Sequence, residues 1–283
     1  MAFPKNKKPA SKRVLEDWVL EYGQQNGSNP GRVARTIAFT ALGQVLQYSA
    51  AGTSEQFIVK GGVAIELRMK GRPRTTQDID AIFLGDFDEW LLRLDLLLRQ
   101  QVEGFSFERK GGPRPLGPTG AYRVMIQVFY NSKIFRTVPL EVSGVEAEDF
   151  LLPEALEAFD LRQFGFEQMR PIYVVSLAHA TAQKLHACTE RSPDRDNDRV
   201  RDIPDLLFIR DELAAEELSQ TKKACHEVFR SRGKQKWPPK LDIPDNWRDI
   251  YPLLAEENDL PIDDLNQAVQ EVNEFIKAID QSA

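Results

Sequence analysis

Two aspartates at alternate positions follow a double glycine in this sequence, with fifteen residues between the two motifs. Asp78 and Asp80 flank Ile79, and Gly61-Gly62 comes soon after the apolar run 57–59. On a β-strand, residues i and i+2 project from the same face, so the two carboxylates would stand side by side. Two such anions repel unless a cation joins them. Oxygen ligands of this kind suit Mg²⁺ or Mn²⁺, which proteins usually hold through one or two carboxylates plus substrate phosphates. The pair therefore predicts a divalent-metal site that is loaded together with a phosphorylated substrate.

The double glycine supplies what the phosphates would need. Gly61 and Gly62 lack Cβ atoms and permit close approach, and a helix that starts there offers unpaired N–H groups and the positive end of its dipole. A glycine pair alone usually marks a simple turn, so the prediction depends on the ordered combination with the aspartates.

Glu141 is a candidate third metal ligand, because it lies in an apolar strand pattern, 138–142, that could pair beside the aspartate strand. Three carboxylates could hold two metal ions, which together clamp the attacking and leaving oxygens of a phosphoryl or nucleotidyl transfer. The alternative is an exposed acid at a strand edge.

A second group of charges lies later in the chain. Lys184 interrupts an apolar, small-residue helical pattern, where a cation usually needs an anionic partner. Either Asp202 or a phosphate is that partner. In the catalytic interpretation Lys184 neutralises the α- or γ-phosphate with help from Arg201, and Asp202 orients Lys184 or positions the attacking hydroxyl. In the structural interpretation these residues form a salt bridge between helices.

The hydrophobic patterns place these residues on an α+β framework. Two helices, 15–22 and 30–50, are expected to back a sheet, followed by a strand, tight turn and helix over 57–68, a strand at 78–84 and an amphipathic helix at 86–101. Residues 103–143 predict two or three antiparallel strands broken at Gly111-Gly112 and at 113–120. A last strand at 171–175 precedes an all-helical region. We expect a mixed-sheet domain over 1–165 and an α-helical domain over 166–283.

Composition narrows the class of protein. The 283 residues are 42% apolar and 28% charged, so the chain can bury a core without disulfides. Cys188 and Cys225 have no partner at a zinc-binding spacing, and no segment resembles a signal peptide or a membrane span. These features predict a cytoplasmic protein with no membrane partner. Residues 1–75 carry an excess of seven positive charges within a net charge of −6, and the segment 5–13 is expected to be a mobile basic arm.

The segments KGGVAIELRMKGRPRTTQDID and KLHACTERSPDRDNDRVRDIPDL together resemble the AbiEii/AbiGii-type (MenT-like) nucleotidyltransferase toxins of type IV toxin–antitoxin systems, over roughly residues 55 to 210. The family pattern is a glycine pair or Gly-Ser, a basic residue before Ser or Thr, an Asp-x-Asp, and later a Lys followed by a basic-Asp-x-x-Asp. The matching positions are Gly61, Gly62, Arg74, Thr75 or Thr76, Asp78, Asp80, Lys184, Arg201, Asp202 and Asp205.

The resemblance implies a polymerase-β-like nucleotidyltransferase domain, use of an NTP with Mg²⁺, a cognate antitoxin, and transfer of NMP to an RNA hydroxyl, the tRNA 3′ end, with release of pyrophosphate. The expected site residues are grouped by role. The catalytic residues are Asp78, Asp80, Lys184 and Asp202, the nucleotide-binding residues are Gly61, Gly62, Arg74, Lys184 and Arg201, and the metal ligands are Asp78, Asp80 and Glu141.

Three arginines near the aspartates, Arg68, Arg72 and Arg74, would guide an RNA backbone together with the basic arm, or would simply be solvated surface. Two other functions remain open from the sequence. The same core could transfer the nucleotide to a protein or small-molecule hydroxyl, or the chain could be a non-catalytic partner-binding protein.

Overall fold

The chain forms two compact units. The computed structural model describes residues 3–49, 52–53, 57–69, 76–117, 120–145, 153–191, 196–257 and 260–283. The first unit contains the described residues up to Val174, and the second runs from Val175 to Ala283. The predicted division at residue 165 lies nine residues earlier, before a short strand that the structure groups with the first unit.

The first unit is built on a mixed seven-stranded sheet with the strand order β5-β6-β7-β4-β3-β9-β8. β4 is parallel to β7 and β3 is parallel to β9, whereas the other neighbours are antiparallel. The strands are β3 (Phe57–Lys60), β4 (Ile79–Phe83), β5 (Phe105–Leu116), β6 (Ala121–Tyr130), β7 (Lys133–Ser143), β8 (Glu154–Leu156) and β9 (Ile172–Val174), and a separate pair is β1 (Tyr48–Ser49) with β2 (Gly52–Thr53). The expected α+β class is confirmed.

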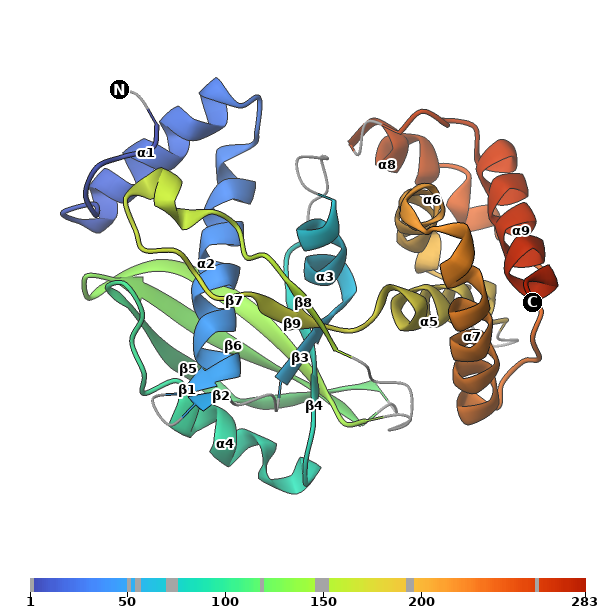
Figure 1. Ribbon diagram of the computed structural model, residues 1–283, viewed down its shortest axis with the longest axis horizontal. Coiled ribbons are helices and arrows are strands. Elements are labelled where there is room, and N and C mark those ends of the chain that lie inside the picture. The colour runs from blue at the N-terminus through green and yellow to red at the C-terminus, as the bar shows by residue number, and fades with distance from the viewer. Residues whose placement is uncertain are drawn as a thin grey trace. The chain divides into compact units, whose positions relative to one another are not determined.

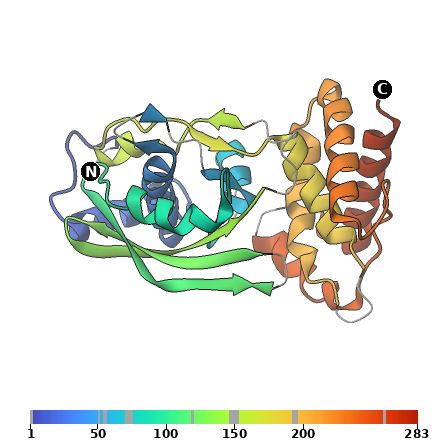
Figure 2. The same ribbon diagram turned by 90° about the horizontal axis from the view of Figure 1, so that it is seen from below.

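Helices cover one face of this sheet (Figures 1 and 2). They are α1 (Lys12–Gln25), α2 (Pro30–Gln47), α3 (Gly61–Arg68) and α4 (Trp90–Leu97). α2 contacts β7, β3 and β9, as the sequence predicted for a helix that backs the sheet. Asn29 caps its N-terminus through a hydrogen bond from the backbone N–H of Arg32, and Pro30 stands at a position where its missing N–H is not needed.

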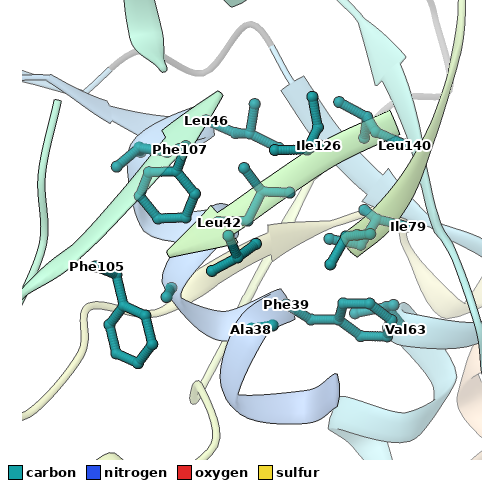
Figure 3. Close-up of a cluster of buried hydrophobic side chains, with 14 of the residues drawn as sticks. Ala38, Phe39, Leu42, Leu46, Val63, Ile79, Phe105, Phe107, Ile126 and Leu140 are labelled. Atoms are coloured by element: carbon teal, nitrogen blue, oxygen red, sulfur yellow. The ribbon is translucent and has the colours of Figure 1, made fainter. Parts of the chain in front are cut away.

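The core lies between α2 and the sheet (Figure 3). Leu42 and Leu46 of α2 point toward Ile126 and Leu140 of the sheet, and all four side chains are fully buried. Burying one such side chain contributes about 1.5 to 3 kcal/mol relative to leaving it in water. Because this apolar layer occupies one face, the charged residues at alternate strand positions face the other side.

The N-terminal segment is not a mobile arm. The ammonium of Lys5 donates to Glu21 at 2.8 Å, the backbone N–H of Lys5 bonds to Gln163, and the hydroxyl of Tyr130 donates to the carbonyl of Pro9. A Cβ on Gly165 would lie 2.0 Å from the carbonyl oxygen of Lys7, so these two segments of the chain are in close contact. The expectation of mobility was wrong because the lysines were counted as solvated charges, whereas Lys5 and Lys8 have acidic partners in the fold.

Other differences concern the strands. Gly111-Gly112 does not break the hairpin, because β5 continues through it with an irregular register between Lys110 and Arg114. The helix expected at 86–101 covers only Trp90–Leu97 after one short turn. β8 was not predicted, since three residues carry too little periodicity.

The second unit is helical. Its helices are α5 (Leu177–Thr189), α6 (Asp202–Glu212), α7 (Leu218–Arg232), α8 (Tyr251–Glu257) and α9 (Leu265–Gln281). Cys188 and Cys225 are both buried free thiols, and burial raises their pKa values well above the usual range. Among the described residues of both units, no helix combines the length and the apolar character that crossing a membrane requires.

Gln47 ties three elements of the first unit together, which yields a stability prediction. Its buried amide donates to the carbonyls of Phe57 and Tyr173 and accepts from the N–H of Tyr173. Gln47→Leu should lower the free energy of unfolding by about 2 to 4 kcal/mol, because it leaves buried backbone groups without partners. Urea denaturation measures the change. The matched control Gln25→Leu, at an exposed end of α1, should change stability by less than about 0.5 kcal/mol. Equal effects of the two substitutions would contradict the role of Gln47.

Candidate functional site

Strand β3 passes directly into helix α3 at the double glycine. Lys60 ends the strand and Gly61 begins the helix, with a backbone φ of +62° that favours glycine. A Cβ placed on Gly61 would lie 2.0 Å from Oδ2 of Asp80. The carboxylate of Asp80 therefore packs against the glycine backbone, and the two motifs recognised in the sequence meet in space.

Strand register aligns four charged residues across the sheet. Lys60 is opposite Asp80, Asp80 is opposite Glu141, and Glu141 is opposite Arg123. Residues paired in this way project from the same face, so the row reads positive, negative, negative, positive from β3 to β6. Asp78 lies just before β4 and is partly exposed.

Arg123 is the cationic centre beside these acids. Its Nε donates to Oε1 of Glu141 at 2.8 Å, and its Nη2 contacts the same oxygen. These hydrogen bonds raise the pKa of Arg123 above its usual value; burial opposes the shift, and the charges of Glu141, Asp78 and Asp80 add to it. Three carboxylates thus act on one guanidinium that is 45% exposed.

A divalent ion such as Mg²⁺ needs oxygen ligands that lie close together. Within the described ranges, no group of three or more His, Cys, Asp or Glu side chains is spaced to hold a metal ion. The side chain of Glu141 is engaged by Arg123. Asp78 and Asp80 are partly exposed and provide oxygen ligands, which fits an ion held by one or two carboxylates plus substrate phosphates. The residues present therefore fit a metal that arrives with a nucleotide.

The second unit contains the later group of charges. The ammonium of Lys184 lies 2.7 Å from Oδ1 of Asp202 and 2.6 Å from Oδ2 of Asp205. Asp205 is fully buried, and the other two side chains are nearly so. Asp202, one of the two partners offered by the sequence, does bind the lysine, and Asp205 adds a second carboxylate. The pair of ionic contacts links α5 to the start of α6.

The remaining predicted residues are placed as follows. Arg201 is exposed in the short turn before α6, and Gly62 is buried in the first turn of α3. Thr76 is buried, with its hydroxyl 3.5 Å from the carbonyl of Asp78. Arg74 and Thr75 lie outside the described residues. Arg68, expected on an RNA path, donates instead to Glu154 at 2.6 Å.

Sequence reasoning missed Arg123 and the role of Lys60. The ammonium of Lys60 donates to the hydroxyl of Ser143 at 2.8 Å, across β4. Neither residue stands in a motif, and nothing local distinguishes Arg123 from the other cations of the hairpin. Pairing 121–130 with 133–143 through their two-residue turn would have set Arg123 opposite Leu140, because the strands shift register between Val128 and Phe129 and only that shift brings Arg123 opposite Glu141.

The chain is similar to known proteins in sequence and in fold. The family model "Nucleotidyl transferase AbiEii toxin, Type IV TA system" matches residues 44–280, which include the glycine turn, the aspartates and Lys184. Among solved structures, the chain is similar to MenT4, a nucleotidyltransferase toxin of Mycobacterium tuberculosis H37Rv, with a TM-score of 0.61 and 14% identity over 96% of this chain and 90% of that chain. That likeness establishes the fold. No curated protein matches the sequence.

The contact between Gly61 and Asp80 gives a prediction with an internal control. Gly27 has the same φ of +62°, but a Cβ there would meet nothing within 4 Å. Gly27→Ala should therefore destabilise the protein by only the backbone cost of about 1 to 2 kcal/mol. Gly61→Ala should cost about 1 to 3 kcal/mol more, because its methyl group displaces the carboxylate of Asp80. Thermal and urea denaturation measure both. Equal costs would contradict the close approach.

Lys184 gives a second prediction, for stability. Lys184→Met should lower the free energy of unfolding by about 3 to 5 kcal/mol, because it leaves the buried carboxylate of Asp205 without its cation. Lys223→Met, which removes an exposed lysine of the same unit, is the matched control and should have an effect below about 0.5 kcal/mol. A stable Lys184→Met variant would show that the three charges are solvated rather than mutually dependent.

Proposed function

We propose, because the chain belongs to the AbiEii family of nucleotidyltransferase toxins of type IV toxin–antitoxin systems, that it transfers NMP from an NTP to the 3′ hydroxyl of an RNA, with tRNA as the first candidate. In this reaction the acceptor oxygen bonds to the α-phosphorus, the bond from that phosphorus to the bridging oxygen breaks, and pyrophosphate leaves. The hydroxyl proton passes to water. A cognate antitoxin would limit the effect on growth.

One observation carries this proposal. The carboxylate of Asp80 lies against the backbone of Gly61, where a strand turns into a helix. This contact brings an anionic, metal-attracting group next to a turn at which phosphate could approach the backbone. Neither motif alone would specify nucleotide chemistry, but their contact would couple a cation site to a phosphate site.

The metal would be held by Asp78 and Asp80. Mg²⁺, when bound, would neutralise charge on the triphosphate and make the acceptor hydroxyl easier to deprotonate. Asp78 and Asp80 would supply carboxylate oxygens to the ion, and both side chains are partly exposed. Glu141 would join the ligand set after it leaves Arg123, and Mn²⁺ satisfies the same oxygen donors.

The triphosphate would lie at the start of α3. The first-turn N–H groups of a helix have no intrahelical acceptor, so those near Gly61 and Gly62 at the start of α3 would receive phosphate oxygens. Arg74 and Arg201 would add cationic contacts, as the family pattern implies.

Lys184 and Asp202 would act on the phosphates and the acceptor. We propose that Lys184 neutralises phosphate charge during transfer and that Asp202, which bonds to it at 2.7 Å, holds its ammonium in place. A purely structural role would show up as a variant that melts earlier but keeps its turnover per folded molecule.

The decisive prediction concerns Asp80. Asp80→Asn should reduce nucleotide transfer at least a hundredfold, because an amide is a poor ligand for Mg²⁺, while the protein remains folded. Purified protein is incubated with total RNA, Mg²⁺ and each α-labelled NTP, and labelled products are separated by size. The matched control is Asp88→Asn, an exposed aspartate in the turn before α4, which should retain full activity.

The products distinguish the possible acceptors. Label in tRNA-sized RNA supports the proposal, whereas label in protein or in small molecules would move the chemistry to another acceptor. Absence of any label with wild-type protein, or full activity of Asp80→Asn, would refute it.

A further inference from the structure

The β5–β6 hairpin presents basic residues on the face opposite the core. Arg114 of β5 is directly opposite Arg123 of β6, and Lys110 is opposite Met125, two residues further along the same strand. All three cations therefore project from one face. Figure 2 shows the described helices of the first unit on the other side of β5, β6 and β7. Lys110, Arg114 and Arg123 are all exposed, and we name them the hairpin cations.

Two of the three hairpin cations are not offset by an ion pair among the described residues, whereas Arg123 is offset by the acids beside it. Two like charges directly opposite on neighbouring strands destabilise a sheet. In the part of the chain that the structure describes, Lys110 and Arg114 make no ion pair, and Arg123 pairs only with Glu141. Glu108 is the acid on this face of β5, and it is opposite Gln127, beyond Lys110 and away from Arg114. Such a surface attracts an external polyanion.

The other face of the same hairpin shows the contrast. Arg109 donates to both carboxylate oxygens of Asp95 at 2.8 Å, which satisfies its charge within the protein. Arg109 and Arg114 lie on the same strand and differ in which side of the sheet they face. Among the described residues of β5, the basic side chains without an ion pair, Lys110 and Arg114, therefore lie on the face of the hairpin opposite the core.

The position of these cations fits a polymeric acceptor. Neighbouring strands lie about 4.8 Å apart, so Arg114 stands about 10 Å from Glu141 and about 15 Å from Asp80 along the row. A short single-stranded end can span this distance. A small-molecule acceptor would not reach Arg114 while it reacts beside Asp80.

Rigid backbone supports the same site. Pro113 and Pro115 flank Arg114, and their fixed φ angles limit the movement of this part of β5. A guanidinium fixed in this way loses less entropy when it binds phosphate.

We propose that the hairpin cations, centred on Lys110 and Arg114, bind the phosphodiester backbone of the polynucleotide whose 3′ hydroxyl receives the nucleotide. This inference rests on the proposed function and deepens it by assigning the acceptor a surface. Contacts of this kind fix position without reading bases, so a range of RNA sequences would bind.

RNA binding without nucleotide or Mg²⁺ tests the proposal. The probe is a fluorescently labelled mixed tRNA fraction, titrated with the full chain and followed by anisotropy. Lys110→Glu/Arg114→Glu should raise Kd at least tenfold and reduce the slope of log K against log salt by roughly one to two, as expected for two lost phosphate contacts. The control Arg93→Glu/Lys133→Glu carries the same change in net charge on exposed residues of α4 and of the turn-side end of β7, and should stay within twofold.

The outcomes separate this inference from the proposed function. Three outcomes would overturn the assignment of the RNA-binding surface to the hairpin. They are an equal loss of RNA affinity in both double variants, unchanged affinity of Lys110→Glu/Arg114→Glu, and no RNA binding by the wild-type protein. Asp80→Asn should bind tRNA like the wild type, because it changes the chemistry and not this surface. If tRNA receives label normally in Lys110→Gln/Arg114→Gln, which removes charge without reversing it, the transferase function stands and the hairpin assignment falls.

Discussion

The register of β4 between β3 and β7 is the constraint on which the charged site depends. Pairing sets Asp80 against Lys60 on one side and against Glu141 on the other, and β6 then brings Arg123 into line. A slip of one residue would turn these side chains into the apolar core and expose Ile79 in their place. The burial of one face of the sheet therefore fixes the charges on the other. The core and the chemistry are specified by the same alternating pattern.

Crowded carboxylates in both units lie beside cations from the same unit. Arg123 acts on Asp78, Asp80 and Glu141 in the first unit, and Lys184 binds Asp202 and Asp205 in the second. The two cases differ in solvent exposure. Arg123 is half exposed and can change partners at small cost. The side chains of Lys184, Asp202 and Asp205 are almost fully buried, and their ion pairs contribute to the packing of α5 against α6. The first arrangement suits exchange of ligands, and the second suits a fixed geometry.

Short-range patterns in the sequence were enough to predict the local parts of the site. The double glycine between apolar strand and helix, and the alternation of aspartate with isoleucine, each follow from nearest neighbours along the chain, and both were placed correctly. The pairing of β4 with β7 was also anticipated, since both are apolar strands with acids at matching positions. Arg123 and Asp205 could not be assigned their partners, because those contacts depend on register and helix packing between distant segments. The basic arm was misjudged for the same reason: Lys5 and Lys8 pair with Glu21 and Glu103, which lie 16 and 95 residues away in the sequence.

The prolines of β5 have an effect beyond their neighbours. β5 is the outermost strand of the sheet, and an edge strand offers its free N–H and C=O groups to any other extended chain. Pro113 and Pro115 remove two donors from this stretch, and the irregular register at Gly111-Gly112 interrupts its regular spacing. A strand from a second copy therefore cannot continue the hydrogen-bond ladder there. This stretch of the hairpin is therefore a poor template for the edge-to-edge addition of another strand.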